Sequence, residues 1–336
     1  MLVTGSSGVW LETADGRQIL DAGGGAIVTN IGHGRPEIAQ VASKALERLD
    51  YVVPVFATEA RVALAEEVSD NWLPDPSWRS VFVSGGSESV DAAIRVAQLH
   101  HVASGRSERH KVIGRDVSYH GATLGALSAG LHDRRRKGLE QALLSMPKTS
   151  HYDAEELEKV IELEGPDTIS AFIGEPVIGA AAGAYVPPDD YWPRISEICA
   201  RHDILVIADE VMTGFGRLGT PMGHEALQFT PDIIAAGKGL GGGYVPIGGV
   251  YCRPDVVAPI AETDLALMFY TFAGHDLCCA VAKKVLEIVR AENLIDRARI
   301  MGELLRERLE QEFHDHPNVE EVRGRGLLQG LGLVAN

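Results

Sequence analysis

Cysteine is scarce in this chain of 336 residues, which has only four: Cys199, Cys252, Cys278 and Cys279. None of them has C-x-x-C spacing and the last two are adjacent, which suits neither a disulfide framework nor a zinc site. The chain also lacks an N-terminal basic stretch followed by an apolar one, the pattern of a secretory signal. We therefore expect a cytoplasmic protein, in a reducing compartment, without a metal site.

Positive charge is in deficit, since 31 Lys and Arg stand against 47 Asp and Glu, for a formal net charge of −16. Such a chain repels nucleic acids and anionic lipid surfaces. No run approaches the roughly 18 apolar residues that a membrane span needs. Neither nucleic acid nor membrane is therefore an expected partner. The one basic cluster, DRRRKG from Asp133 to Gly138, is typical of a solvated loop, and its sequence gives it no role.

Apolar and polar residues alternate around Asp15-Gly16, which predicts a β-hairpin, and Pro36 fits the first turn of a helix that follows it. From Arg79 onward, strand-like runs alternate with helical patterns. The strand-like runs are RSVFVS, KVIGRD, ISAFIGE, ILVIADE, PDIIAAG and IGGVYC. One of the helices begins at Ser87, and another has Asp153 as its N-cap. This alternation predicts βαβ units and a largely parallel sheet covered by helices.

The end of the chain departs from this pattern. Two amphipathic helices are predicted in DLCCAVAKKVLEIVRAEN and IDRARIMGELLRERLEQEF. Strand-like residues from Leu327 to Val334 then follow, with no later segment to pair with or cover them. A small domain is therefore expected to begin here and to be incomplete.

Two carboxylates end the buried run ILVIADE. In an open parallel sheet, ligands bind beyond the carboxyl ends of the strands. Asp209 and Val211 should share one face of the strand, while Glu210 points away. A carboxylate beside a β-branched side chain suits a protonated heteroaromatic ring, so we expect Asp209 to bind a ring N–H. Glu210 is expected to anchor the loop that follows.

Two further segments suggest an amine nucleophile and an anion site. Lys238 lies between two glycines, which permit close backbone approach, and crowding can lower the pKa of a lysine enough for nucleophilic attack. Residues 85–87, Gly-Gly-Ser, lie between a predicted strand and a helix, whose N-terminal N–H groups suit a phosphate. No Lys-Ser or Lys-Thr follows these glycines, so this is not a P-loop.

A dinucleotide site is one alternative, because Gly214, Gly216 and Gly219 form a G-x-G-x-x-G pattern with Asp232 beyond it. That fingerprint needs a helix beginning at the glycines, whereas TPMGHEALQFTP offers only a short helical patch. The two carboxylates just upstream would also repel a pyrophosphate.

A metal-dependent hydrolase is another alternative, with ligands drawn from His120, Glu175, Asp209 and Glu210. It is disfavoured because Asp209 and Glu210 face opposite sides of a strand.

A ring-binding acid, an amine and a phosphate site on one α/β sheet are together what pyridoxal phosphate requires. The chain resembles, over essentially its whole length, the class III aminotransferases among the fold-type-I pyridoxal-phosphate enzymes. Seven segments carry the resemblance in the family's order: GGGAIVTNIGHGRPEI, VSGGSES, SYHGATLGALSAG, EPVIGAAAGAYVPPDDY, IADEVMTGFGRLG, PDIIAAGKGLGGGYVPIGG and YTFAGHDLCCAVA.

The resemblance implies an α/β fold in which a large domain holds a mostly parallel seven-stranded sheet covered by helices, beside a small α+β domain that looks incomplete at its C-terminus. Residues 1–48 would form the hairpin and linking helix of the small domain. Residues 49–292 would form the large cofactor-binding domain, and residues 293–336 the start of a truncated C-terminal small domain.

The resemblance also implies roles for individual residues. Lys238 would form a Schiff base with pyridoxal 5′-phosphate and shuttle a proton, and Asp209 would keep the ring nitrogen protonated. The other implied positions are Gly86 and Ser87 at the phosphate, Val211 and Tyr119 on the two ring faces, His120 beside Tyr119, Glu175 near the substrate, and Thr271 at the phosphate of the neighbouring subunit. The last contact implies a homodimer with shared sites. Glu175 either gates substrate charge or is a structural acid at a strand end.

Two positions bear on the substrate. Met212 stands where several relatives have a Gln near the cofactor's phenolic oxygen. The family's C-terminal domain often supplies an arginine for the substrate carboxylate; Arg217 is not given that role here and is expected to fix its loop.

The resemblance implies ping-pong transfer of an amino group from an amine donor to a keto acceptor. The run AAAGAYVPPDDY and the apolar Met212 favour an amine or ω-amino acid as the donor and a 2-oxo acid such as pyruvate as the acceptor. The alternatives are a decarboxylase, racemase, mutase or lyase on the same scaffold, or a truncated and catalytically inert protein of this fold.

Overall fold

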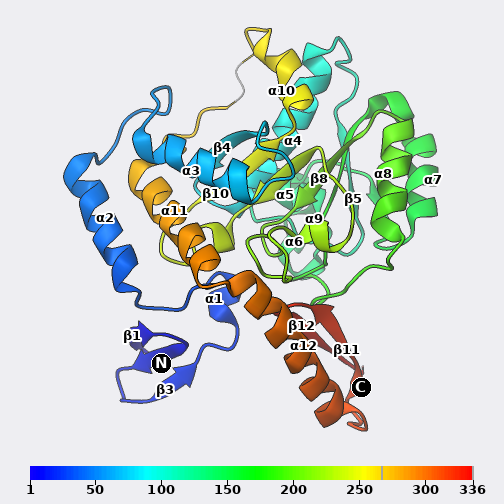
Figure 1. The fold of residues 1–336 in the computed structure, drawn as a ribbon. Helices are drawn as coiled ribbons and strands as arrows, with labels where there is room; N and C mark the ends of the chain where they lie inside the picture. The colour runs from blue at the N-terminus through cyan, green and yellow to red at the C-terminus, as the bar shows by residue number, and fades with distance from the viewer. Residues whose placement is uncertain (266–267, 335–336) are drawn as a thin grey trace.

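The computed structural model describes residues 1–265 and 268–334, and a seven-stranded sheet forms its centre (Figure 1). The strand order is β4-β10-β9-β8-β7-β5-β6, and only β10 runs antiparallel to its neighbours. The strands are β4 (Arg79–Val83), β5 (Lys111–Arg115), β6 (Lys148–Thr149), β7 (Ile169–Gly174), β8 (Leu205–Asp209), β9 (Ile233–Ala236) and β10 (Gly248–Cys252). The predicted mostly parallel sheet is therefore confirmed.

Helices cover both faces of this sheet because alternate residues of each strand point to opposite sides. In β8, Leu205 and Ile207 pack into one buried cluster, with residues of α4 (Gly86–Ala103) and α10 (Pro254–Ala261). Val206 and Ala208 of the same strand pack into the other cluster. The helices that contribute to that second cluster include α3 (Glu59–Asn71), α8 (Tyr191–Arg201) and α11 (Asp276–Ala291).

The remaining helices connect or flank these layers. They are α1 (Gly24–Ile27), α2 (Pro36–Arg48), α5 (Leu124–Ala129), α6 (Asp133–Arg136), α7 (Ala154–Glu164), α9 (Gly223–Ala226) and α12 (Leu294–Phe313), with short 3₁₀ turns η1 (Glu140–Ala142), η2 (Pro166–Thr168) and η3 (Lys238–Leu240). The predicted N-terminal signals are confirmed: Pro36 occupies the first turn of α2, and the Asp153 side chain accepts hydrogen bonds at the start of α7.

The N-terminal hairpin is also confirmed, since β2 (Trp10–Thr13) pairs antiparallel with β3 (Gln18–Leu20) across the Asp15-Gly16 turn. A third strand, β1 (Val3–Ser7), pairs with β2 and was not predicted. Figure 1 places this small sheet and α12 at the same end of the molecule.

The strand-like end of the chain is paired with another strand. β12 (Leu328–Leu333) pairs antiparallel with β11 (Val319–Arg325), an earlier segment whose charged sequence VEEVRGR concealed its strand character. Arg323 of β11 donates a hydrogen bond from Nε to the carbonyl of Gly183 at 3.0 Å, which attaches this hairpin to the large sheet's loops. The sequence did not predict that an earlier segment pairs with the last strand, and the domain boundaries at residues 48 and 292 stay a prediction.

No helix in the described ranges is both long and apolar enough to cross a membrane. The four cysteines are free, and three of them are buried.

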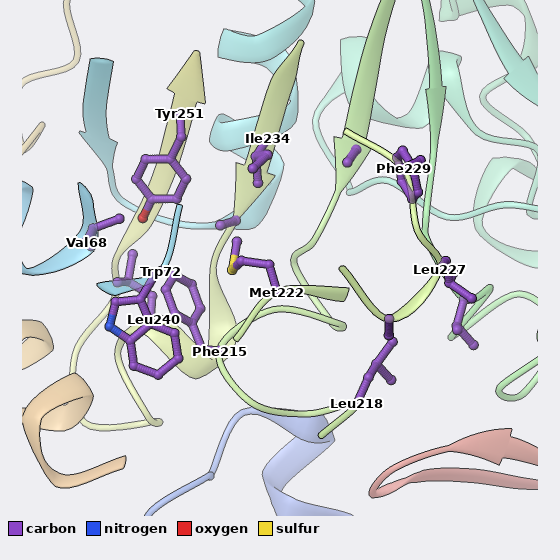
Figure 2. Close-up of a cluster of buried hydrophobic side chains, with 14 of the residues drawn as sticks. Val68, Trp72, Phe215, Leu218, Met222, Leu227, Phe229, Ile234, Leu240 and Tyr251 are labelled. Atoms are coloured by element: carbon purple, nitrogen blue, oxygen red, sulfur yellow. The ribbon is translucent and has the colours of Figure 1, made fainter. Parts of the chain in front are cut away.

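The loop after β8 is pinned into the core by apolar side chains. Phe215 packs against Trp72 with ring centroids 5.5 Å apart, and Met222 is fully buried nearby (Figure 2). Because these contacts hold both halves of the loop, the residues directly after β8 have little freedom to move.

The buried side chain of Glu210 holds the same loop through hydrogen bonds. Its carboxylate is fully buried and accepts hydrogen bonds from the backbone N–H groups of Gly223, at 2.8 Å, and His224, at 2.6 Å. The hydroxyl of Thr213 donates a further bond to it. The expectation that Glu210 anchors the loop is therefore confirmed.

We predict that Glu210→Ala lowers the free energy of unfolding by about 3 kcal/mol, because two buried N–H groups and a hydroxyl lose their acceptor. Urea unfolding at pH 7 measures the change. Glu303→Ala is the matched control, because this exposed carboxylate only pairs with Arg299 along α12, and its loss should change stability by less than about 0.5 kcal/mol. Equal effects of the two variants would contradict the anchoring role.

His101 of α4 makes stability depend on pH. The side chain is fully buried with Nε2 3.0 Å from the carbonyl of Ser170, and burial lowers its pKa from 6.5 to about 4. Between these two values the unfolded chain binds a proton that the folded chain does not, so stability falls as the pH falls.

We predict that this histidine alone removes about 2 kcal/mol of stability between pH 8 and pH 5. Urea unfolding of the wild type and of His101→Gln at both pH values isolates the contribution. The difference between the two proteins should change by that amount across the pH range, and a constant difference would show that His101 is not buried in its neutral form.

Candidate active site

A cavity lies at the carboxyl ends of the parallel strands. It is lined by Gly86, Ser87, Tyr119, His120, Gly121, Glu175, Asp209, Val211, Met212 and Lys238. These residues follow β4, β5, β7, β8 and β9, whose ends meet at one edge of the sheet. Eight of the nine residues predicted for the site line this cavity, and Thr271 does not.

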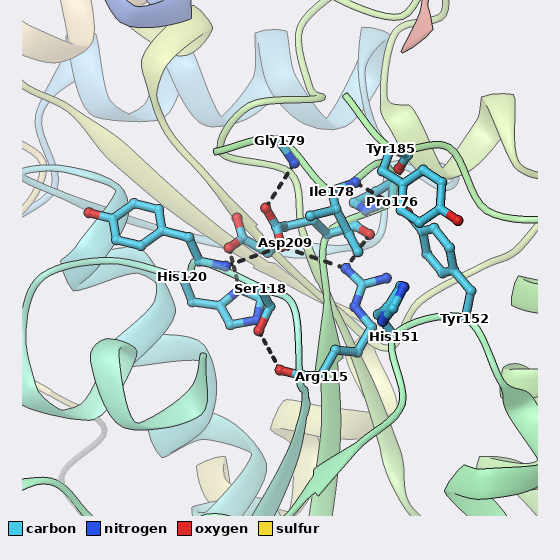
Figure 3. Close-up of polar contacts among 12 residues, drawn as sticks. Arg115, Ser118, His120, His151, Tyr152, Pro176, Ile178, Gly179, Tyr185 and Asp209 are labelled. Atoms are coloured by element: carbon cyan, nitrogen blue, oxygen red, sulfur yellow. Dashed lines mark hydrogen bonds and ion pairs between the residues drawn. The ribbon is translucent and has the colours of Figure 1, made fainter. Parts of the chain in front are cut away.

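Asp209 is held in one orientation at the end of β8. The side chain is 3% exposed, and Oδ2 lies 2.7 Å from Nδ1 of His120 (Figure 3). Oδ1 accepts a bond from the N–H of Val211 at 3.1 Å. A proton on Nδ1 of His120 donates to this carboxylate and leaves Nε2 as an acceptor, which has no partner among the described residues. Asp209 can therefore present fixed negative charge to a cationic group in the cavity.

Lys238 is a partly buried amine that opens η3, directly after β9. Its φ of 41° lies in the left-handed region, a strained conformation for a residue other than glycine. Burial lowers the pKa of its ammonium group, while the nearby carboxylates of Asp209 and Glu175 act in the opposite direction. A larger share of neutral amine is therefore available for nucleophilic attack than on an exposed lysine.

The N-terminus of α4 offers an anion site. Its N-cap, Gly85, contributes no side-chain hydrogen bond, so the first N–H groups of this 18-residue helix are not capped. A Cβ atom at Gly86 would lie 2.7 Å from Cγ1 of Val211, so only glycine fits between the helix and that side chain. The hydroxyl of Ser87 accepts a bond from the N–H of Ala122 at 3.0 Å, which holds it at the cavity wall. Uncapped N–H groups and the helix dipole suit a phosphate group.

Glu175 joins two loops beneath the cavity. Its Oε2 accepts from the N–H of Tyr119 at 3.3 Å, and its Oε1 accepts from the N–H of Gly179 at 3.2 Å. Burial raises the pKa of this carboxyl group, an effect opposed by His120 and Arg115. Of the two roles left open by the sequence, the contacts support the structural one directly, since they position the backbone of Tyr119.

Arg115 was missed by the sequence analysis. It is fully buried at the end of β5, and its Nη2 donates to the carbonyl oxygen of Glu175 at 2.7 Å (Figure 3). Its guanidinium lies 5.6 Å from the ring centroid of Tyr152 and 5.7 Å from that of Trp192. The only sequence signal was a basic residue at the end of an apolar strand. The positive charge of Arg115 stabilises the buried carboxylate of Glu175.

Met212 forms an apolar part of the cavity wall. A Cβ atom at Gly179 would approach its Sδ to 2.4 Å, so glycine at that position leaves room for the thioether. This wall offers no hydrogen bond of the kind a Gln would make.

Thr271 lies in an exposed turn away from the cavity. Its carbonyl accepts a hydrogen bond from the hydroxyl of Tyr51 at 3.0 Å, and the ring of Tyr51 packs edge-on against Phe272. Thr271 is therefore exposed and does not line the cavity.

The alternative sites are not supported by the geometry. Gly214, Gly216 and Gly219 lie in turns, and the next helix, α9, has four residues and begins only at Gly223. The helix that a dinucleotide fingerprint needs is therefore not there. Across residues 1–265 and 268–334, no group of three or more His, Cys, Asp or Glu is arranged to hold a metal ion.

Known proteins are similar to this chain over its whole length. The family model "Aminotransferase class-III" matches residues 1–336. Putrescine–pyruvate aminotransferase of Pseudomonas aeruginosa is 34% identical, in an alignment covering 100% of this chain and 77% of the relative. An omega-aminotransferase of Caulobacter vibrioides is 33% identical over 99% of this chain and 80% of its own length.

Solved structures give the same result. The crystal structure of an (S)-enantioselective omega-transaminase from Thermomicrobium roseum superposes with a TM-score of 0.95 at 36% identity, covering 100% of this chain and 78% of that one. The sheet order, the cavity at its carboxyl edge and these matches lead to one conclusion: the chain belongs to the class III aminotransferases, with the fold of the fold-type-I enzymes.

Proposed function

We propose that this aminotransferase uses pyridoxal 5′-phosphate to move an amino group from an amine or ω-amino acid to a 2-oxo acid such as pyruvate, by a ping-pong reaction. The observation that carries the proposal is the convergence of Lys238, Asp209 and the uncapped N-terminus of α4 in one cavity. The names of the relatives, which mention putrescine, pyruvate and omega-amino groups, support the substrate classes.

The residues of the cavity fit the cofactor's chemical groups. Asp209, oriented by His120, would pair with a protonated ring nitrogen, and the α4 N-terminus with Ser87 would hold the phosphate. The ring would lie between Val211 and Tyr119. When bound, the cofactor supplies a carbonyl group that takes up the amino group and a ring that withdraws electrons from the substrate carbon.

The protein's own part in the reaction is to bind, orient and move a proton. Nζ of Lys238 would hold the cofactor and afterwards accept the proton that leaves the substrate carbon, then return it. This role needs an amine that is neutral for part of the time, and the lowered pKa of Lys238 supports it. Asp209 would maintain positive charge on the ring nitrogen, because contacts with His120 and with the N–H of Val211 hold its carboxylate in one orientation.

We predict that borohydride reduction of the protein with pyridoxal phosphate attaches the cofactor to the peptide containing Lys238, as peptide mass spectrometry would detect. Lys238→Ala should show no adduct and form no alanine from pyruvate and an amine donor. Alanine formation by the wild type separates transamination from decarboxylase, racemase, mutase or lyase chemistry.

Lys148→Ala is the matched control. Burial lowers the pKa of Lys148 to about 8, but its ammonium group donates to the carbonyls of Ser128 and Met146 outside the cavity. This variant should keep both the adduct and the activity. An adduct on Lys148 instead of Lys238 would refute the assignment.

We also propose a homodimer in which Thr271 completes the cofactor site of the neighbouring subunit. Exposed apolar side chains lie around its turn: Tyr51, Val55, Phe56, Phe269 and Phe272. An apolar surface of this kind suits a protein interface. The four free cysteines support the further proposal that the enzyme works in the reducing environment of the cytoplasm.

We predict that subunits carrying Lys238→Ala and subunits carrying Thr271→Ala complement each other. Thr271→Ala alone should weaken cofactor affinity by about tenfold, the effect of one lost hydrogen bond to phosphate. A mixed dimer has one site with both native residues, and random pairing makes about half of the dimers mixed, so co-expression should restore about a quarter of the wild-type activity at limiting cofactor. If the mixture performs no better than its Thr271→Ala component, the residues act within the same subunit.

A further inference from the structure

The basic cluster of residues 133–136 lies beside the active site, although its sequence suggested a solvated loop. Arg136 attaches α6 to the preceding helix: its Nη1 donates to the carbonyls of Leu127, at 2.9 Å, and Gly130, at 2.7 Å. These are carbonyls at the C-terminal end of α5, where a cation is favourable. The position of α6 is therefore fixed by a specific contact.

Arg135, the preceding residue, packs on a side chain of the cavity. Its guanidinium carbon lies 4.5 Å from the ring centroid of Tyr119, and Tyr119 lines the cavity. The ring of His132 packs edge-on against the same tyrosine, with centroids 5.9 Å apart. An exposed arginine with up to four rotatable side-chain bonds is thus held at one place by an aromatic ring.

A position over the ring of Tyr119 is compatible with a guanidinium whose hydrogen-bonding groups stay available. A guanidinium stacks through its flat face, while all its N–H donors lie in its plane and point outward. Within the described ranges, no carboxylate forms an ion pair with Arg135 and its guanidinium makes no hydrogen bond, whereas its backbone N–H donates to the carbonyl of His132 at 3.0 Å. Its planar fork matches the two oxygens of a carboxylate.

The cavity carries negative charge, so a cation is needed for an anionic substrate to bind there. The cavity wall carries two carboxylates, Asp209 and Glu175, against one amine, Lys238, on a protein whose net charge is −16. Every 2-oxo acid brings a further carboxylate next to its reacting carbonyl, and this carboxylate would be repelled without a compensating cation. The charge of Arg135 reaches the reacting region, since it contributes to lowering the pKa of Lys238.

Arg217 also contributes to lowering the pKa of Lys238, but it is less suited to bind a substrate. Its guanidinium is directed toward the carbonyl of Thr29, with Nη2 3.5 Å away, and it lines a different cavity, beside α12. The backbone of Arg217 also accepts a bond from Leu327. This agrees with its expected role in fixing the loop.

We propose that Arg135, held over the ring of Tyr119, binds the carboxylate of the 2-oxo acid acceptor. The inference rests on the proposed transamination and adds to it a residue that determines specificity. Acceptors and donors with a carboxylate bind through Arg135, while amines and aldehydes without one do not depend on it.

The test compares two acceptors of the same length, pyruvate and propanal, with a donor that lacks a carboxylate, such as butylamine. Arg135→Met should raise the KM for pyruvate by about tenfold or more, the loss expected for a charge-assisted pair. The KM for propanal should change by less than about twofold, because no ion pair is lost. Arg135→Lys keeps the charge without the planar fork and should lie between the two.

Arg134→Met is the matched control, because it removes the same charge from the same exposed helix without a contact to Tyr119. It should behave as the wild type toward both acceptors. An equal loss for pyruvate and propanal in Arg135→Met would overturn the proposal, since it would mean that Arg135 only supports the tyrosine ring. An unchanged KM for pyruvate would also overturn it.

Binding of an unreactive carboxylate separates this inference from the reaction itself. Ligand-observed NMR with propanoate should detect binding to the wild type and to Arg134→Met, and a loss of binding in Arg135→Met. This result does not depend on turnover, so it decides the role of Arg135 even if no transamination is found. Retention of propanoate binding in Arg135→Met would refute the proposal.

Discussion

The buried hydrogen bond between Asp209 and His120 is the contact on which the rest of the site depends. A carboxylate at 3% exposure is stable only if partners compensate its charge, and here the imidazole lies 2.7 Å away. The two residues come from the ends of β8 and β5, with β7 between them, so the contact spans three strands of the sheet. Glu175 ends the middle strand, and Arg115 behind it supplies the cation that a second buried acid requires.

The adjacent acids Asp209 and Glu210 have different roles, because successive side chains of a strand point to opposite faces of the sheet. Asp209 faces the cavity, whereas Glu210 turns into the loop that follows and binds its backbone. That loop begins with Val211 and Met212, which form the cavity wall. Glu210 therefore shapes the site without entering it, and the stability of the loop and the geometry of the site are coupled through one buried carboxylate.

The sequence predicted those parts of the structure that local patterns determine. All strands of the large sheet except the two-residue β6 were readable as apolar runs, and Asp209 and Lys238 as polar residues at or just beyond the ends of two of them. Since parallel strands end at one edge, their convergence followed from topology. Arg115 and β11 were missed because charged residues in these strands read as solvent-exposed, and their burial or pairing depends on distant partners. The position of Arg135 likewise depends on how α5 returns the chain toward Tyr119, which no local pattern encodes.

An anionic cavity that must accept anionic substrates has a conflict of charge. A cation at its floor would attract a carboxylate but would also pair with Asp209 and cancel the field meant for the cofactor ring. Arg135 avoids this conflict of charge, because it contacts Tyr119 and pairs with neither acid. The same arginine disfavours the charged form of Lys238, which keeps its amine closer to the neutral state that attack requires. One cation that contacts Tyr119 and not the acids would thus serve substrate binding and nucleophile activation together.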